Sequence, residues 1–501
     1  MSKQVRVRFA PSPTGPLHIG GVRTALFNYL FAKKNNGVFF LRIEDTDQNR
    51  FVPGAEEYIM EALEWVGIAR DETIGKNEKF GPYRQSERKD LYQQYAAELI
   101  NSGNAYYAFD TAEALDVARK LEEEQGKTFI YNHTNREKLD TSLVISADET
   151  AKRIAAGEHY VIRFKTPVNE TLHLHDIIRG DVKFETNLLD DKVLFKSDGM
   201  PTYHLANIVD DHLMETSHVI RGEEWLPSMP LHVLLYRAFG WESPEFAHLP
   251  LIMKPVGNGK LSKRDGDKMG FPVFPLDWKT AEGVSSGYRE KGFFPEAVIN
   301  FLALLGWNDG TDKELFSLEE LVAAFDLNRV HKAGAKFDPE KNKWFNHQYL
   351  IKQEDATLAK AYAPILAEKG FSVADTVLTK VVSLIKERAH FVSEFWEMSD
   401  FFFVAPTAYD EKASKNWNSA TPALMQELIS VVEEITDFTS MNIETIVKDW
   451  MTKNEIGMGK VMQPFRLSLV GALKGPHLFD IVEVIGKDET IQRIQKAIAT
   501  L

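Results

Sequence analysis

A glycine-rich segment near the N-terminus has the spacing of a phosphate-binding loop but lacks its lysine. In GPLHIGG, Gly15 and Gly20 have the G-x-x-x-x-G spacing of a P-loop, and a helical pattern follows. Gly21 stands where a P-loop has its lysine, and His18 lies inside the loop. A histidine there can donate a hydrogen bond to a phosphoryl oxygen as charge develops in a transition state. A plain surface histidine is the alternative, and the loop taken alone favours it.

A second segment offers candidates for the missing cation. KLSKR, from Lys260 to Arg264, packs three cations into five residues and is flanked by Gly257, Gly259 and Gly266. Glycines favour a mobile loop, and a mobile cationic loop can close over a triphosphate. A solvated loop or a nucleic-acid patch explains the same residues. Neither segment is decisive by itself.

The elements that must position these segments are readable from hydrophobic periodicity. Residues 5–9 alternate between apolar and polar, with Arg8 on the polar face, which predicts a strand. Apolar residues at helical spacing over 22–30 predict an amphipathic helix, and residues 38–43 predict a buried strand. Strand, helix and strand form a βαβ unit, whose ligands lie beyond the carboxyl ends of the parallel strands. We therefore expect residues 8–21 and 44–47 at one rim.

The rest of the chain predicts an interrupted α/β fold followed by helices. Residues 92–196 mix helix and strand patterns, SDGMPTYHLANIVDDH and HVIRGEEWL suggest a return to the first sheet, and beyond about residue 317 nearly all patterns are helical. We expect a Rossmann-like parallel-sheet catalytic domain with an α/β insertion, followed by an all-helical half. The expected boundaries are 1–91 and 197–255 for the catalytic domain, 92–196 for the insertion, 256–325 for a loop and stem-contact region, and 326–501 for the helices.

Composition excludes some classes of protein. With 501 residues, 44% hydrophobic and 26% charged, the chain is typical of a globular protein with several domains. It contains no cysteine, which excludes disulfides and thiolate metal sites. No apolar run is long enough to span a bilayer and no signal-peptide pattern is present, so we expect a cytoplasmic protein with no membrane partner. The net charge of −14 argues against nucleic acid on average, although residues 254–268 hold five Lys/Arg against two Asp.

Taken together, these motifs resemble a known family. PSPTGPLHIGG and KLSKR resemble HIGH and KMSKS, the two signatures of class I aminoacyl-tRNA synthetases, with Gly21 in place of the last His and Arg264 in place of the last Ser. Both departures resemble the glutamate/glutamine branch. RFAPSPTGPLHIGG, RIEDTD, GPYRQSER, SDGMPTYHLANIVDDH and VIRGEEWL are similar to segments of bacterial glutamyl-tRNA synthetases over roughly the first 350 residues.

The resemblance implies a set of site residues. In this family an arginine holds the substrate's side-chain carboxylate, and two guanidinium groups would disfavour the neutral amide of glutamine. The positions that match glutamate contacts are Arg8, Ser12, Glu44, Tyr203, Asn207 and Arg221. The positions that match ATP contacts are His18, Gly20, Gly21, Glu224, Ile252, Lys260, Ser262, Lys263 and Arg264. Of these, His18, Gly20, Lys260 and Lys263 are implied to be catalytic.

The resemblance also implies a reaction and its partners. L-glutamate and ATP, with Mg²⁺ accompanying the ATP, would give glutamyl-adenylate and pyrophosphate, and the terminal ribose of tRNA(Glu) would then take the glutamyl group and release AMP. The insertion would hold the tRNA acceptor end without the zinc knuckle of some relatives, because cysteine is absent. The helical half would bind the anticodon, with Trp344, Arg388, Gln463 and Arg466 as candidate contacts. A monomer is expected, with no protein-bound metal.

Three alternatives stay open at this point. The first is a non-discriminating enzyme that also charges tRNA(Gln), because the discrimination depends on a few anticodon contacts. A nucleotidyltransferase of the same α/β superfamily would share the histidine loop but would have no use for about 175 C-terminal helical residues. A non-catalytic RNA-binding module would not need Arg8, His18, Lys260 and Lys263 together. The segment 266–291 is longer than expected and is interpreted either as a lid or as a tRNA contact.

Overall fold

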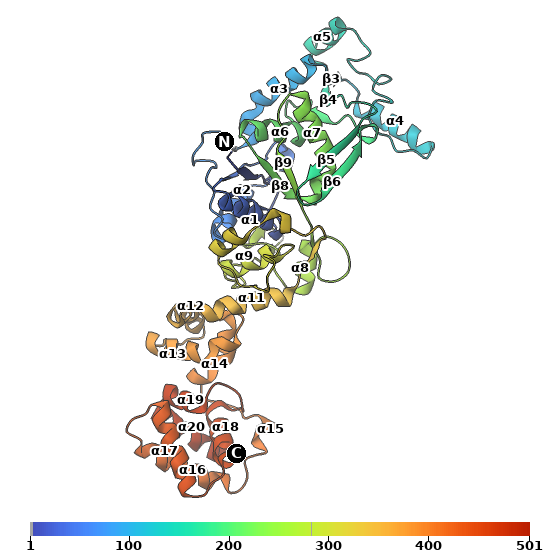
Figure 1. The fold of residues 1–501 in the computed structure, drawn as a ribbon. Coiled ribbons are helices and arrows are strands. Elements are labelled where there is room, and N and C mark those ends of the chain that lie inside the picture. The colour runs from blue at the N-terminus through green and yellow to red at the C-terminus, as the bar shows by residue number, and fades with distance from the viewer. Residues whose placement is uncertain (1–3, 282) are drawn as a thin grey trace. The chain divides into compact units, whose positions relative to one another are not determined.

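The chain forms two compact units in a computed structural model that describes residues 4–281 and 283–501 (Figure 1). The first unit comprises the described residues up to Lys291 together with Pro295–Asn342, and the second comprises Gly292–Phe294 with Lys343–Leu501. The unit boundary falls inside α11 (Pro339–Lys352). Each unit has its own hydrophobic core.

A strand, a helix and a parallel strand open the first unit. β1 (Arg6–Phe9) pairs in parallel with β2 (Val38–Leu41), and α1 (Ile19–Lys34) connects them. Because α1 buries apolar side chains such as Val22 and Leu26, it packs on the sheet through the face that the periodicity indicated. The predicted βαβ unit is confirmed.

A second parallel pair returns the chain to this sheet. β8 (His218–Gly222) pairs with β9 (Glu245–Leu249), and the backbone N–H of Ser217 donates to the carbonyl of Arg6 over 2.9 Å. β8 therefore lies beside β1, as the sequence predicted for the segments after residue 197. α6 (Tyr203–Leu213) and α7 (Met229–Ala238) accompany these strands (Figure 1).

Between the two halves of the sheet the chain builds antiparallel structure. β4 pairs with both β3 and β7 in a three-stranded antiparallel sheet, and β5 and β6 form a hairpin. The backbone N–H of Ile177, which follows β5, donates to the carbonyl of Phe246 in β9 over 2.8 Å, so the hairpin is fixed to the parallel strands. The elements of this stretch are α2 (Ala55–Trp65), α3 (Lys89–Asn101), β3 (Ala105–Ala108), α4 (Ala112–Glu124), α5 (Ala147–Ala155), β4 (Val161–Phe164), β5 (Thr171–Asp176), β6 (Gly180–Glu185) and β7 (Val193–Phe195).

The last part of the first unit follows the lysine-rich loop. β10 (Ile252–Met253) pairs in parallel with β13 (Ala335–Lys336), and β11 (Trp278–Thr280) pairs with β12 (Gly283–Ser285). The helices here are α8 (Lys263–Met269), α9 (Pro295–Leu304) and α10 (Leu318–Ala324). Phe271, Val273, Phe274 and Leu276 are buried, so residues 271–276 are packed into the unit.

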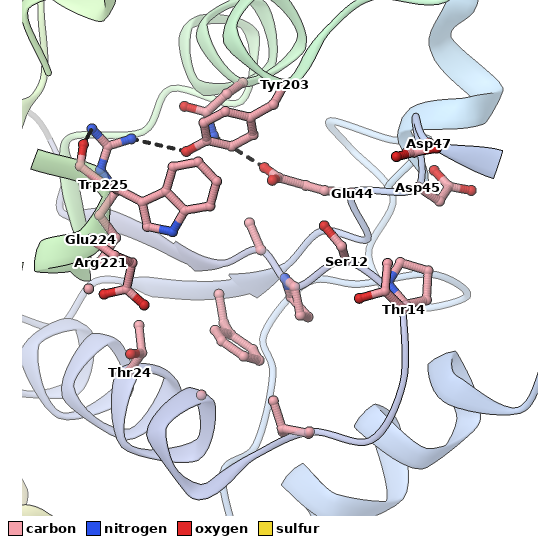
Figure 2. Close-up of a pocket in the computed structure, with 18 of the residues that line it drawn as sticks. Ser12, Thr14, Thr24, Glu44, Asp45, Asp47, Tyr203, Arg221, Glu224 and Trp225 are labelled. Carbon is pink, nitrogen blue, oxygen red and sulfur yellow. Dashed lines mark hydrogen bonds between the residues drawn. The ribbon is translucent and has the colours of Figure 1, made fainter. Parts of the chain in front are cut away.

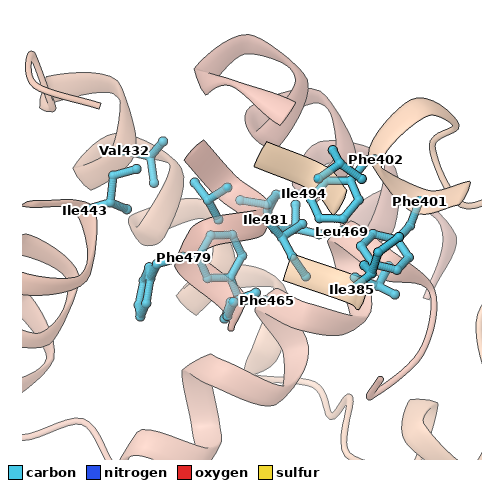
Figure 3. Packing of buried hydrophobic residues seen from close by; sticks show 14 of the residues in the cluster. Ile385, Phe401, Phe402, Val432, Ile443, Phe465, Leu469, Phe479, Ile481 and Ile494 are labelled. Carbon is cyan, nitrogen blue, oxygen red and sulfur yellow. The ribbon is translucent and has the colours of Figure 1, made fainter. Parts of the chain in front are cut away.

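The second unit is helical throughout its described residues. Its buried core joins side chains such as Ile385, Phe465 and Ile494 from α13, α18 and α20 (Figure 3). Its elements after α11 are α12 (Asp355–Glu368), α13 (Asp375–Ile385), α14 (Phe395–Phe403), α15 (Glu411–Ser414), α16 (Thr421–Glu434), α17 (Ser440–Lys453), α18 (Met458–Val470), α19 (Leu478–Ile485) and α20 (Lys487–Thr500). The predicted fold class, α/β followed by helices, is confirmed; the two-residue strand β13 is the exception within 326–501.

Candidate active site

A cavity of about 810 Å³ lies at the carboxyl ends of β1, β2 and β8, entirely within the first unit (Figure 2). This is the rim that the βαβ pattern indicated. The structure brings most of the sequence-predicted residues to its wall: Arg8, Ser12, His18, Gly20, Gly21, Glu44, Tyr203, Asn207, Arg221, Glu224, Ile252 and Lys260. Ser262, Lys263 and Arg264 are exposed on or beside α8 and do not line it. The roles of all these residues stay predictions.

His18 is the N-cap of α1, and its position fixes which nitrogen carries the proton. Its Nδ1 accepts the backbone N–H of Gly20 over 3.1 Å, so a neutral ring carries its proton on Nε2. Burial and the charge of Lys260 lower the pKa of His18 to about 4, so the ring is neutral at pH 7. Nε2 is buried with no hydrogen-bond partner in the described chain. An unpartnered N–H donor therefore stands at the N-terminus of a helix, where anions bind.

Gly21, which follows His18, Ile19 and Gly20, is needed for close packing. A Cβ on Gly21 would lie 2.5 Å from Cδ1 of Leu17 and 3.5 Å from Cζ of Phe9, both of which are buried. A Cβ on Gly20 would meet Nδ1 of His18 at 3.6 Å, an ordinary contact. Gly21 thus lets the loop fold closely over β1.

Lys260 is the cation of the KLSKR segment that reaches the cavity. Its Nζ donates to Oε1 of Glu224 over 2.9 Å, and both side chains are about half exposed. Burial opposes the charge on Glu224, but Lys260 outweighs it and holds the pKa of Glu224 below its usual value. The pair places an ammonium group at the cavity wall close enough for its charge to act on His18, where the P-loop lysine was missing.

The segment after α8 supports the His18 loop from behind. The carbonyl of Val273 accepts the N–H of Ile19 over 2.9 Å, and the Phe274 ring meets the His18 ring edge-on with centroids 5.9 Å apart. The Tyr58 hydroxyl donates to the Leu276 carbonyl (2.5 Å) and accepts the Leu276 N–H (3.1 Å). These contacts make residues 273–276 a structural support for the His18 loop, and the lid and tRNA-contact interpretations of the longer segment stay predictions.

Arg8 is held in place by a carboxylate that sequence analysis missed. Its Nε and Nη2 donate to Asp211, each over 3.0 Å, and both side chains are buried. Arg42 also donates to Asp211 (2.8 Å) and to Glu44 (2.9 Å), and Asn207 donates to Glu44 over 3.2 Å. Burial opposes the charge on Asp211, but the two guanidinium groups outweigh it and lower the pKa of this carboxyl. The Nη1 edge of Arg8 is not used by Asp211.

Arg221 has a different environment, because the groups that contact it directly are neutral. Nε donates to His248 Nε2 (3.1 Å), Nη1 to the Tyr203 hydroxyl (3.0 Å) and to His232 Nδ1 (3.2 Å), and Nη2 to the Trp225 carbonyl (3.3 Å). Burial and the charge of Arg221 lower the pKa of His232 well below its usual value. In the described chain no carboxylate lies within ion-pair distance of Arg221, which leaves its positive charge available at the cavity wall.

Other residues of the site were also missed. Arg23 in α1 lines the cavity and donates to the carbonyl of Leu305 over 2.9 Å, and Trp225 packs on Tyr203 with ring centroids 4.4 Å apart. Asp45 and Asp47, by contrast, line the cavity at the rim where residues 44–47 were expected (Figure 2). The described residues contain no group of three or more His, Cys, Asp or Glu that could hold a metal ion. Within that same part of the chain no helix is long and apolar enough to cross a membrane.

In the second unit, two of the predicted tRNA contacts meet at one loop. Arg388 donates to the carbonyl of Gly475 (3.1 Å), and Arg466 donates to those of Lys474 (3.0 Å) and Pro476 (2.8 Å). Burial and the neighbouring Arg388 lower the pKa of Arg466. Gln463 accepts from Asn416 over 2.9 Å, and Trp344 is half-buried with its ring 5.0 Å from that of Phe345. Arg388, Arg466 and Lys474 thus form a basic cluster, and the tRNA contacts stay predictions.

Comparison with known proteins agrees with this geometry. Residues 4–344 match the family model of tRNA synthetases class I (E and Q), catalytic domain, and residues 356–498 match an anticodon binding domain. The chain is 86% identical to a glutamate–tRNA ligase of Flavobacterium johnsoniae and 80% identical to one of Flavobacterium psychrophilum, each over 100% of both chains. A crystal structure of a glutamate tRNA ligase from Elizabethkingia meningosepticum in complex with its amino acid is 54% identical and superposes with a TM-score of 0.96 over 100% of both chains. The chain belongs to the class I tRNA synthetases of the glutamate and glutamine branch.

Proposed function

We propose that the protein attaches L-glutamate to tRNA in an ATP-dependent reaction through glutamyl-adenylate. The observation that carries this proposal is the cavity that holds a neutral His18 donor at a helix N-terminus and Arg221 with no carboxylate partner. The first feature suits the phosphates of ATP and the second suits a carboxylate side chain. Relatives that are 86% and 80% identical over the whole chain are named glutamate–tRNA ligases.

In the activation step the α-carboxylate of glutamate attacks the α-phosphorus of ATP, and pyrophosphate leaves. Arg8 and Arg221 bind the side-chain carboxylate, and Glu44 binds the α-amino group. Burial raises the pKa of Glu44, but Arg42 and Arg8 oppose this shift and favour the ionised form that an ammonium group needs. Neutral His18 donates a hydrogen bond to the phosphates, Lys260 supplies positive charge, and Lys263 joins them when the loop closes. MgATP is the form of nucleotide that binds.

In the transfer step the terminal ribose hydroxyl of tRNA attacks the adenylate and releases AMP. The inserted stretch 92–196 holds the acceptor end, and the basic cluster of the second unit contacts the anticodon stem or loop. Because one chain carries both the cavity and the helical unit, we propose a monomer that works in the cytoplasm, where translation uses its product. We propose the same domain boundaries that the sequence patterns predicted.

The test is aminoacylation with radiolabelled glutamate and glutamine, against purified tRNA(Glu) and tRNA(Gln) separately. Glutamate on tRNA(Glu) alone indicates a discriminating enzyme whose second unit rejects the other anticodon. Glutamate on both tRNAs indicates a non-discriminating enzyme with the same active site. Charging of neither tRNA would reject the ligase and favour a nucleotidyltransferase.

A further inference from the structure

A buried hydrogen-bonded chain runs from the β5–β6 hairpin to Arg221. Asp176 Oδ2 lies 2.6 Å from His248 Nδ1, and His248 Nε2 lies 3.1 Å from Arg221 Nε. The side chains of Asp176 and His248 have no exposed surface. The chain joins three strands, β5, β9 and β8. The proposed activation step uses Arg221 but neither of these two contacts.

The donors and acceptors of this chain admit one arrangement of protons. A guanidinium group only donates, so His248 Nε2 must accept from Arg221 Nε–H. The ring proton then sits on Nδ1 and donates to Asp176. Burial lowers the pKa of His248 even though Asp176 opposes the shift, which keeps the ring neutral. The carboxylate therefore fixes the tautomer that Arg221 requires.

Asp176 is itself held firmly. Its Oδ1 accepts the backbone N–H groups of Ile178 (3.0 Å) and Arg179 (2.8 Å), and the N–H of His248 lies 3.1 Å from Oδ2. Burial opposes its charge, but these hydrogen bonds and His248 outweigh it and lower the pKa of this carboxyl. A rigid carboxylate orients the imidazole, and the imidazole orients the guanidinium.

We propose that Asp176 and His248 are positioning residues for Arg221, which fix its guanidinium toward the substrate carboxylate without neutralising it. A carboxylate in direct contact, as Asp211 is with Arg8, would compete with the substrate for the same charge. A neutral imidazole supplies the hydrogen bond and leaves the charge in place. This inference rests on the proposed glutamate site. It gives the hairpin a role in amino-acid recognition that the sequence did not assign to residues 92–196.

Asp176→Asn is the variant that tests the tautomer. If the amide oxygen keeps the backbone N–H groups of Ile178 and Arg179, the amide NH₂ faces His248 Nδ1. The ring must then accept at Nδ1 and carry its proton on Nε2, where it meets the N–H of Arg221. The size of the side chain is unchanged and the hydrogen bond to the guanidinium is lost, while the backbone N–H of His248 keeps Oδ1, 3.3 Å away in the wild type, as its acceptor.

The matched control is Asp181→Asn on the same hairpin. Asp181 lies 2.8 Å from His175 Nδ1, and both side chains are largely exposed. This pair repeats the carboxylate–imidazole contact away from the cavity. We expect the KM for glutamate and the thermal stability of Asp181→Asn to match those of the wild type.

The measurement is the steady-state charging of glutamate onto tRNA(Glu), with thermal unfolding of each variant. We expect Asp176→Asn to raise the KM for glutamate about 10- to 100-fold, with kcat and the KM for ATP within about threefold of the wild type. His248→Gln, which keeps an acceptor, should retain more glutamate affinity than His248→Leu. An unchanged KM for glutamate would overturn the proposal, and so would parallel losses in all parameters together with a lower Tm.

The wild-type protein supplies an independent readout that does not depend on how a variant folds. ¹⁵N spectra of histidine-labelled protein, with His248 assigned by its loss in His248→Gln, report which ring nitrogen carries the proton. Protonated Nδ1 with unprotonated Nε2 supports the inference, and the opposite tautomer overturns it. Charging of glutamate and the ¹⁵N spectrum test separate claims. A wild type that charges no glutamate would reject the proposed function, whereas the spectrum would still report whether the hydrogen-bonded chain exists.

Discussion

His18→Asn separates the two hydrogen bonds that the histidine can make. In the structure Nδ1 caps α1 through the N–H of Gly20, whereas Nε2 is buried without a partner in the cavity wall. Asparagine is among the best N-cap residues, and its Oδ1 can replace Nδ1 as the acceptor. No asparagine atom reaches the position of Nε2. The variant therefore keeps the helix and removes the donor.

The expected magnitudes follow from these two contacts. Loss of one preorganised donor to developing charge lowers a rate about 10²- to 10³-fold. His18→Asn should show this fall in kcat for adenylate formation with a free energy of unfolding within about 0.5 kcal/mol of the wild type. His18→Ala should show the same fall and a further loss of about 1 kcal/mol of stability, because the cap is gone.

The assay is ATP–pyrophosphate exchange with tRNA present, at saturating ATP and varied glutamate, next to urea unfolding of all three proteins. The KM for glutamate serves as an internal control, since His18 is expected on the phosphate side of the cavity. A rate for His18→Asn within threefold of the wild type would refute the role of Nε2. A stability loss equal to that of His18→Ala would refute the cap.

The same variants test the ionisation of His18. Its pKa is about 4 in the folded protein and 6.5 when exposed. Because the folded-state pKa is depressed, the unfolded chain binds the proton first, and stability is lost as pH falls from 6.5 toward 4. This linkage amounts to about 2 kcal/mol between pH 7.5 and pH 5. The difference in stability between the wild type and His18→Asn should shift by this amount in favour of the variant, and a difference independent of pH would contradict a neutral His18.

Four further changes have distinct outcomes. Arg8→Ala should raise the KM for glutamate about 30-fold or more, because a charged partner of the substrate is lost, with kcat less affected in the same charging assay. Lys263→Ala should mainly lower the activation rate measured by ATP–pyrophosphate exchange with tRNA present, since this exposed side chain can reach the nucleotide only when the loop closes; the reverse pattern of KM and rate would reject both assignments. Gly287→Ala places a Cβ 2.1 Å from the carbonyl carbon of Leu276, and we expect a loss of about 1–3 kcal/mol in urea unfolding together with a lower kcat, as the support behind His18 shifts. Arg466→Ala should raise the KM for tRNA about 5- to 10-fold with the KM for glutamate unchanged, and equal KM values for tRNA would remove this residue from the anticodon contacts.

Local patterns were enough to predict the rim of the site but not the residues behind it. Arg8 and Glu44 follow from strand periodicity and from the rule that ligands lie at the carboxyl ends of parallel strands. His248 lies in the apolar strand EFAHL, where nothing local separates it from an ordinary strand residue. Its partner Asp176 is 72 residues away, and their contact exists only because the β5–β6 hairpin docks on β9. The paired acids of IVDDH were visible, but the guanidinium partners of Asp211 come from β1 and from the residue after β2, and so could not be assigned.

A chain with a net charge of −14 can hold an anionic substrate because the arginines around the cavity have different partners. Arg8 and Arg42 share the Asp211 carboxylate and Arg42 also meets that of Glu44, so carboxylates of the protein itself compensate their charge. Arg221 meets only imidazole, phenol and carbonyl groups directly, and it therefore remains short of one negative charge. Glutamate supplies that charge, whereas glutamine would leave it unpaired and turn amide N–H groups toward N–H donors. The choice of glutamate over glutamine therefore depends on the absence of a protein carboxylate beside Arg221 as much as on the hydrogen bonds that Arg221 donates.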